Sequence, residues 1–376
     1  MEASKFDTSI ADSQGTFVEA IPIDSFDVDR YAEYCAALEK RCTAFQSAPD
    51  GCLVHRRFRV PQVFAGACRD MAVSLSLQLG ALQKSMDFVM DVPNFLEPWY
   101  GIGAVPGAFG AEYIWHGDTA PATVPIFKNV EAALACEPKE IADTPAGKHI
   151  LNMIDFFLEH TRGRLPMSFS DVQSPLDVAA ALVVSSEFYM AVLEDPEAVS
   201  ELLEIIAALS VNFYQKQAAM IGDSLVFPGH GFASSRSFNT GPGLSDDNSI
   251  MLSPENHKDV CSASMNRLGE PFGGFAFHSC GNWSKRAAVV RSFPGIRMAD
   301  AAFTPRTDPS PNPPGPLRDA FANTGLILNA RMVGGGEEVL QTLSELVQPG
   351  MKLILVSYCA DKEEQKRLYE GVKSLT

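Results

Sequence analysis

The sequence has no long apolar run. It also contains few cysteines, and fewer basic than acidic residues. No stretch approaches the roughly 20 apolar residues of a membrane-spanning helix, and the start of the chain, Met1–Asp7, is too polar for the apolar core of a signal peptide. Eight cysteines in 376 residues, without paired spacing, indicate reduced thiols and predict a cytoplasmic protein. Reduced thiols are also free to bind a metal.

The low number of cations bears on the class of partner. Lys and Arg total 30 against 46 Asp and Glu, which leaves a net charge of −16. This balance argues against nucleic acid and against an anionic membrane surface, since both need clustered cations. The one dense basic cluster is His55-Arg56-Arg57-Phe58-Arg59. It either clamps an anionic substrate or is a solvated surface run.

From residue 165 onward, short apolar runs alternate with helical patterns. Ser174, Asp195 and Ser253 each precede a proline, which is typical of a helix start with a capping side chain. The expected strands are 165–169, 223–227, 274–277, 296–301, 325–330 and 352–358. Repeated strand–helix units make a parallel sheet, either open or closed into a barrel.

A missing motif bears on the choice between these two sheets. No Gly-x-Gly-x-x-Gly fingerprint follows any strand, so a dinucleotide-binding fold has no support. We therefore predict an α/β fold, a (β/α)8 TIM barrel over residues 91–376. A mainly helical N-terminal extension, residues 1–90, would pack on this barrel.

The end of the strand expected at 274–277 carries the most informative residues. His278 and Cys280 are two positions apart and would project from the same face of the strand. Cys359 follows the last expected strand, and a barrel brings all such strand ends to one mouth. A His/Cys/Cys set suits zinc with one open position, where an incoming thiol would be held as thiolate. The alternative is that these cysteines are ordinary buried core residues.

Four further residues are candidates for contact with a substrate. Glu97 and Tyr100 lie in a Pro- and Gly-rich stretch, 91–118, which is either a pocket wall or a surface loop. Asp247 follows the strand at 223–227 by a long polar loop, and Asn282 comes just after the expected ligands. If Glu97, Tyr100 or Asp247 faces the metal, it would fill the fourth position when substrate is absent. No catalytic residue is assigned beyond the metal ligands.

These motifs together resemble the uroporphyrinogen decarboxylase superfamily, and most closely its zinc-dependent branch of methylcobamide:coenzyme M methyltransferases. The resemblance covers roughly residues 90–376. The matching pieces, besides His278-x-Cys280-Gly281-Asn282 and Cys359, are Ser174-Pro175-Leu176, Asp195-Pro196-Glu197, Ser245-Asp246-Asp247, Leu252–Glu255, Ala108–Gly110 and Trp115–Asp118.

The resemblance implies a (β/α)8 barrel with zinc on His278, Cys280 and Cys359. It also implies methyl transfer, in either direction, between a corrinoid (methylcobamide) and a thiol or related acceptor. The chain has no Asp-x-His-x-x-Gly cobalamin motif, so the corrinoid would arrive on a partner protein. It also lacks the Arg-rich Met-Arg-Gln-Ala-Gly-Arg motif of the decarboxylases, so porphyrinogen decarboxylation is not expected.

Two rival functions stay open at this point. The first is a metal-free decarboxylase or lyase on the same barrel, driven by a carboxylate at the mouth such as Asp246 or Asp247. The second is a non-catalytic barrel that binds a corrinoid or another small molecule. Assembly into homodimers is also left open by the sequence.

Overall fold

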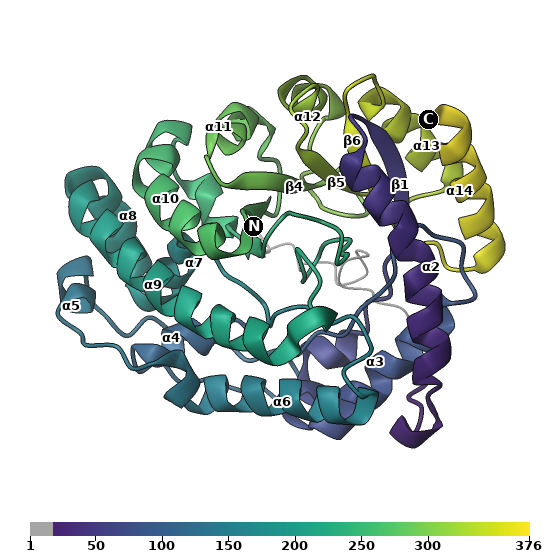
Figure 1. The fold of residues 1–376 in the computed structure, drawn as a ribbon. Coiled ribbons are helices and arrows are strands. Elements are labelled where there is room, and N and C mark those ends of the chain that lie inside the picture. The colour runs from purple at the N-terminus through teal and green to yellow at the C-terminus, as the bar shows by residue number, and fades with distance from the viewer. Residues whose placement is uncertain (1–17) are drawn as a thin grey trace.

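The structure, a computed structural model, describes residues 18–376 and shows a parallel sheet inside a ring of helices (Figure 1). The polar chain start and the first part of the extension expected at 1–90 lie outside the described residues. In the part described, none of the helices has the length and apolar character needed to cross a bilayer.

The strands are β1 (Gly51–Arg56), β2 (Gly243–Ser245), β3 (Phe275–His278), β4 (Ile296–Ala302), β5 (Ile327–Arg331) and β6 (Lys352–Ser357). The helices are α2 (Val28–Ser47), α3 (Met71–Ser85), α4 (Ala104–Ala108), α5 (Val130–Leu134), α6 (Pro145–Thr161), α7 (Pro175–Leu182), α8 (Ser185–Glu194), α9 (Pro196–Ile221), α10 (Pro254–Gly269), α11 (Ala287–Ser292), α12 (Pro314–Phe321), α13 (Gly336–Leu346) and α14 (Lys362–Leu375).

Strand pairing runs most of the way around the ring. The six strands are all parallel, in the order β1-β6-β5-β4-β3-β2. Isolated parallel bridges continue the pairing beyond β2, joining Gln173 to Ser245, Met167 to Leu225 and Leu96 to Met167. This α/β architecture is compatible with a TIM-like barrel and confirms the predicted fold class.

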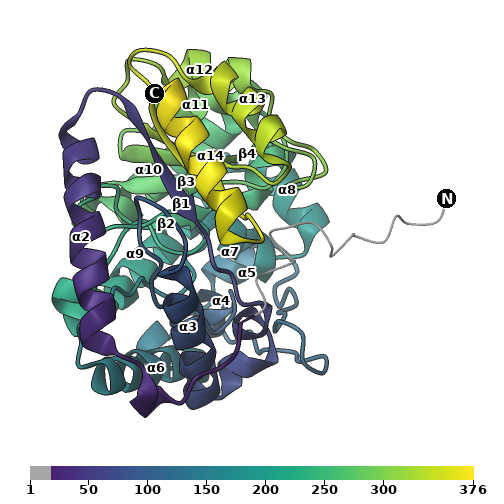
Figure 2. The same ribbon diagram turned by 90° about the vertical axis from the view of Figure 1, so that its right-hand side faces the viewer.

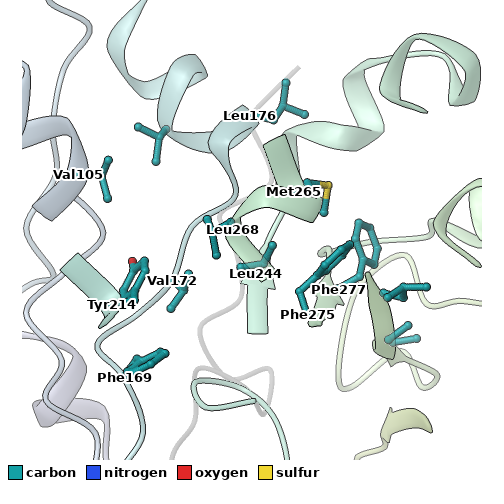
Figure 3. Packing of buried hydrophobic residues seen from close by; sticks show 14 of the residues in the cluster. Val105, Phe169, Val172, Leu176, Tyr214, Leu244, Met265, Leu268, Phe275 and Phe277 are labelled. Carbon is teal, nitrogen blue, oxygen red and sulfur yellow. The ribbon is translucent and has the colours of Figure 1, made fainter. Parts of the chain in front are cut away.

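Side chains that alternate along each strand form two separate cores. Leu53, Ala276, Met298 and Ile354 face inward and pack inside the barrel. Their sequence neighbours face the helices; Figure 3 shows Phe275 and Phe277 of β3 with Leu244 of β2 and with Met265 and Leu268 of α10. Because the side-chain period is two, the C-terminal end of each strand presents its inward residues at the mouth.

The segment 228–242 fills the barrel interior. In Figure 1 this teal-green chain crosses the space inside the ring, and its Phe232, Ala233 and Phe238 belong to the inner core. Glu39 of α2 accepts hydrogen bonds from Ser235 Oγ at 2.5 Å and from the Arg236 N–H at 3.2 Å. Helix α2, which lies along one side of the molecule in Figure 2, therefore anchors this segment.

The expected helix starts are confirmed. The Ser174 hydroxyl accepts the N–H of Asp177 at the start of α7, and Asp195 and Ser253 cap α9 and α10 in the same way. In each case proline occupies the first turn, where it costs no hydrogen bond. Capping by one such side chain typically contributes about 1 kcal/mol.

The strands differ from the prediction at both ends of the sheet. The runs expected at 165–169 and 223–227 contribute only isolated bridges, whereas β1 and β2 were not expected. Because β1 pairs with β6, the sheet includes residues that precede the boundary expected at residue 90. The basic cluster is no solvated run either, because His55, Arg56 and Arg57 are buried.

His55 makes the stability of this first strand depend on pH. Burial lowers the pKa of His55 from 6.5 to about 4, with Arg57 and Arg56 acting in the same direction. The neutral imidazole donates from Nδ1 to the Val92 carbonyl at 3.0 Å. Its stabilising effect is therefore complete above pH 6.5 and is lost as the pH falls towards 4.

We expect a His55→Asn variant, which keeps a donor near the Val92 carbonyl, to lose less stability than the wild type over this pH interval. The difference should reach roughly 3 kcal/mol, from the size of the pKa shift. Urea unfolding of both proteins at several pH values measures it. Equal losses in the two proteins would contradict this role of His55.

Candidate metal centre at the mouth of the barrel

Three potential metal ligands meet at the C-terminal ends of β2 and β3. Asp247 begins the short 3-10 helix η6 (Asp247–Met251), His278 is the last residue of β3, and Cys280 lies two positions further on. One ligand atom of each side chain lies within 4.8 Å of the others. Across residues 18–376, these three form the single such group of three or more His, Cys, Asp or Glu side chains.

The spacing of the three atoms matches what a small tetrahedral cation needs. Cys280 Sγ lies 3.6 Å from His278 Nε2, which in turn lies 3.7 Å from Asp247 Oδ1. Around tetrahedral zinc, sulfur and imidazole nitrogen would be about 3.6 Å apart, and nitrogen and carboxylate oxygen about 3.3 Å. Cys280 is exposed and the Asp247 side chain is 44% exposed, so a fourth position would face solvent.

A buried carboxylate fixes the orientation of His278. Asp300 is the register partner of His278 on β4, and its Oδ2 accepts a hydrogen bond from His278 Nδ1 at 2.6 Å. Arg331 Nε and Asn329 Nδ2 also donate to Asp300, at 2.8 and 2.5 Å. The proton is thereby held on Nδ1, so the Nε2 lone pair faces Cys280 and Asp247.

The pKa shifts follow from these contacts. Burial alone would lower the pKa of His278, but the hydrogen bonds to Asp300 and Cys280 outweigh it and raise the pKa well above its usual value. Burial raises the pKa of the Cys280 thiol, although His278 opposes this shift. The group thus holds protons that a cation would displace on binding.

Asp247 is held in place from two sides. Its Oδ1 accepts the N–H of Cys280 at 2.7 Å, and its own N–H donates to Asp177 Oδ2 at 2.9 Å. Burial, together with the neighbouring Asp246 and Asp247, raises the pKa of Asp177 to about 8. Asp177 and Asp246 are buried, so Asp247 is the one of these three carboxyl groups that is exposed at the mouth.

Cys359, the third ligand expected from the sequence, is not part of this group. Along β6, Ile354 and Val356 face the inner core, whereas Leu353 and Leu355 face the helices. Cys359 has the parity of the outward pair and packs in the outer core, where burial raises its pKa to about 12. Of the expected set, the structure brings His278 and Cys280 together, and the side chain that lies with them is Asp247.

The side chain beside Cys359 faces the other way. Tyr358 packs against the inner core, and its hydroxyl accepts a hydrogen bond from Arg57 Nη1 at 3.5 Å. A shift of one residue along a strand moves a side chain to the opposite face of the sheet. The apolar run alone does not show which of these two residues faces inward.

The other candidates lie outside the three-residue group. Glu97 bonds with His230 elsewhere on the mouth. Tyr100 stacks on His149 at a ring distance of 3.8 Å and lines a pocket of about 480 Å³ with Tyr113 and Trp115. Asn282 accepts from the N–H and hydroxyl of Ser284, at 3.1 and 2.7 Å, and so caps the turn after the ligands.

Sequence reasoning missed several residues of the mouth. Asp300 lies inside the apolar run of β4, and a buried acid of this kind needs partners, which is a signal for a site. Asp171 lies two residues after the apolar run 165–169, and His230 lies between two glycines. Tyr358 carries no signal beyond its place at a strand end.

Neither a protein-family model nor a curated protein matches the sequence. Among solved structures, the chain is similar to a methyltransferase from Methanosarcina mazei, with a TM-score of 0.62 and 14% identity over 90% of this chain and 98% of that one. A putative vitamin-B12 independent methionine synthase from Listeria monocytogenes matches at a TM-score of 0.35 and 14% identity, over 59% and 68% of the two chains. The first similarity spans nearly the whole of both chains and supports a shared fold.

Two cysteine substitutions separate the observed ligand group from the one expected from the sequence. We expect Cys280→Ser to lose bound zinc, because a ligand sulfur disappears, and Cys359→Ser to retain it. Elemental analysis of both purified proteins after zinc loading measures this. Loss of zinc from Cys359→Ser, with Cys280→Ser still loaded, would contradict the geometry.

A second prediction concerns the support of His278. Asp300→Asn removes the charge that fixes the imidazole, and zinc affinity should fall by roughly 10–100-fold. Competition with a chromogenic chelator measures it. The matched control is Asp361→Asn at the start of α14, where Asp361 caps the helix and Asn caps equally well. Equal zinc affinity in the two variants would exclude this role for Asp300.

Proposed function

We propose that the chain is a zinc-dependent methyltransferase, moving a methyl group between a corrinoid carried by a partner protein and a thiol or related acceptor. The observation that carries this proposal is the Asp247/His278/Cys280 group with its open side at the mouth of the barrel. The similarity of the fold to that of a methyltransferase is in keeping with it.

The donor set fits zinc. One sulfur, one imidazole nitrogen and one carboxylate oxygen suit a borderline-soft, tetrahedral ion, and three protein ligands are typical of catalytic rather than structural sites. Zinc bound there would supply a coordination position that keeps an acceptor thiol deprotonated near neutral pH. Asp300 keeps Nε2 of His278 aimed at this position, and the turn at Cys280 is fixed by Asp247.

The surface beside Asp247 suits a protein partner. Helix α8 lies against η6, since the Tyr189 hydroxyl bonds with the Asn248 side chain. Large apolar side chains on these two elements are exposed, which is typical of interaction surfaces. They are Met190, Leu193, Ile250 and Met251, with exposures of 49, 65, 47 and 63%. A corrinoid protein bound there would bring its cofactor next to the exposed Cys280.

The structure weakens the metal-free decarboxylase or lyase. Asp246, one of its two candidate carboxylates, is fully buried and bonds with Ser174 Oγ at 2.5 Å and His257 Nε2 at 2.7 Å. It therefore offers no oxygen to a substrate at the mouth. Asp247 remains accessible, but it lies among metal-competent side chains.

The test uses zinc-loaded protein with methylcobalamin as methyl donor and 2-mercaptoethanol as acceptor. We expect zinc-dependent loss of the methylcobalamin absorbance with formation of the S-methyl product. Cys280→Ser should reduce turnover to background because the ligand sulfur is gone. Cys136→Ser, at a half-buried thiol outside the ligand group, should not.

Two results would count against the proposal. Turnover that is unchanged when zinc is removed would point to a metal-free reaction. Binding of the thiol or of methylcobalamin by the zinc-loaded protein, without any turnover, would favour the non-catalytic binding barrel.

A further inference from the structure

A second polar cluster lies at the mouth, on strand-like segments other than those of the metal group. Glu97 and Asp171 follow the bridge residues Leu96 and Met167, and His230 follows the segment ending at Phe227. His230 Nδ1 bonds with Glu97 Oε2 at 2.7 Å, and its Nε2 lies 3.9 Å from Asp171 Oδ2. The side chains of Glu97, Asp171 and His230 are 14, 7 and 22% exposed, so solvent reaches the imidazole.

Both carboxylates are held in place by other side chains. Gln78 bonds with the main chain of Glu97 on both sides, accepting its N–H at 2.7 Å and donating to its carbonyl at 3.0 Å. Asp171 accepts hydrogen bonds from Trp99 Nε1 and Gln173 Nε2, each at 3.1 Å. The two acids therefore form a fixed frame for the imidazole between them.

The backbone around His230 is equally specific. Gly229 and Gly231 have φ angles of +109° and +83°, a region that favours glycine. The ring of Phe64 packs edge-on against the imidazole at a centroid distance of 5.1 Å. Substitution of either glycine would strain the turn that presents His230.

The same turn reaches the metal group. Phe232, two residues after His230, packs edge-on against the His278 ring at a centroid distance of 6.3 Å. The N–H of Ala233 donates to Asn329 Oδ1 at 3.1 Å, and Asn329 donates in turn to Asp300. The segment that carries His230 thus contacts His278 directly and is linked to Asp300 through Asn329.

Charge also links the two clusters. Burial alone would lower the pKa of Arg57, but Tyr358, Glu97 and Asp300 raise it. The Arg57 guanidinium therefore interacts both with Glu97 of the second cluster and with Asp300, which supports the metal group. His230 contacts Glu97 and Asp171, and the charges of Arg57 and Arg59 act on Glu97. Arg59 also stacks on Phe64.

We propose that His230 is the acid–base group of the mouth and accepts the proton of a thiol that binds at the Asp247/His278/Cys280 group. This inference rests on the proposed function. Glu97 holds the Nδ1 proton, so Nε2 is the accepting nitrogen. The S–H bond breaks, its electron pair stays on sulfur, and the proton bonds to Nε2. The reverse transfer returns the proton to a departing thiol.

The geometry leaves room for this transfer. Among the described residues, Nε2 of His230 makes no hydrogen bond, and its separation of 3.9 Å from Asp171 Oδ2 exceeds hydrogen-bond distance. Nε2 is therefore available to a thiol, or to a water molecule that relays its proton. His230 would then accept the proton at Nε2 without being a ligand of the metal.

The experiment counts protons. 2-Mercaptoethanol is titrated calorimetrically into zinc-loaded protein near neutral pH, in buffers of different ionisation enthalpy, which gives the protons released per thiol bound. We expect the wild type to release clearly less than one proton, since His230 retains part of it. His230→Gln should release one, with unchanged zinc content. His116→Gln, an exposed histidine of the loop at 111–120, should match the wild type.

The outcomes separate the two proposals. If the zinc-loaded wild type does not bind the thiol, the proposed function fails. If it binds the thiol and His230→Gln releases the same number of protons, the role of His230 is overturned and the proposed function stands. Should His230→Gln fail to fold, Glu97→Gln serves instead, because it removes the carboxylate that holds the Nδ1 proton of His230. Its proton release should rise towards one, and a count equal to the wild type would overturn the role of His230.

Discussion

The contact between the imidazole of His278 and the carboxylate of Asp300 is the interaction on which the mouth of this barrel depends. A carboxylate buried in a sheet is costly unless it is paired and hydrogen-bonded. Asp300 meets this condition through His278, Asn329 and Arg331, which lie on β3 and β5, the two strands that flank β4. The parallel register of β3 and β4 places His278 beside Asp300, and the resulting bond leaves Nε2 directed at Cys280 and Asp247.

The barrel supports two polar clusters at one mouth. The segment 228–242 fills the interior of the barrel, so the polar side chains that a substrate could reach lie at the ends of the strands. That segment presents His230 to Glu97 and Asp171, and it also packs Phe232 against His278. One cluster has the donor atoms for a cation and the other has the arrangement of an acid–base group. The same segment therefore contacts both clusters.

The parts of this structure that depend on local sequence could be predicted. Alternation of apolar runs and helices indicated an α/β barrel, and the capping residues Ser174, Asp195 and Ser253 marked three helix starts. The two-residue spacing of His278 and Cys280 placed both on one face, and they lie 3.6 Å apart. Each of these features is decided within a few residues of the chain.

The parts that depend on pairing between distant segments could not be predicted. Cys359 and Tyr358 follow the same apolar strand, and only the packing of β6 decides which of them faces the mouth. Asp247 was expected to contact substrate or fill a fourth position, but its place beside Cys280 depends on a bond across the β2–β3 connection. Asp300 and His230 acquire their partners from distant segments. Strand β2 has only three residues, and β1 ends in His55 and Arg56, so neither stands out as an apolar run.

X-ray absorption at the zinc edge tests the central claim most directly, because it counts the sulfur atoms around the metal. The Asp247/His278/Cys280 group predicts one sulfur at about 2.3 Å and nitrogen or oxygen neighbours near 2.0–2.1 Å in the zinc-loaded protein. Addition of 2-mercaptoethanol should raise the count to two sulfurs. Two sulfurs before any thiol is added, or none at all, would contradict the ligand group described above.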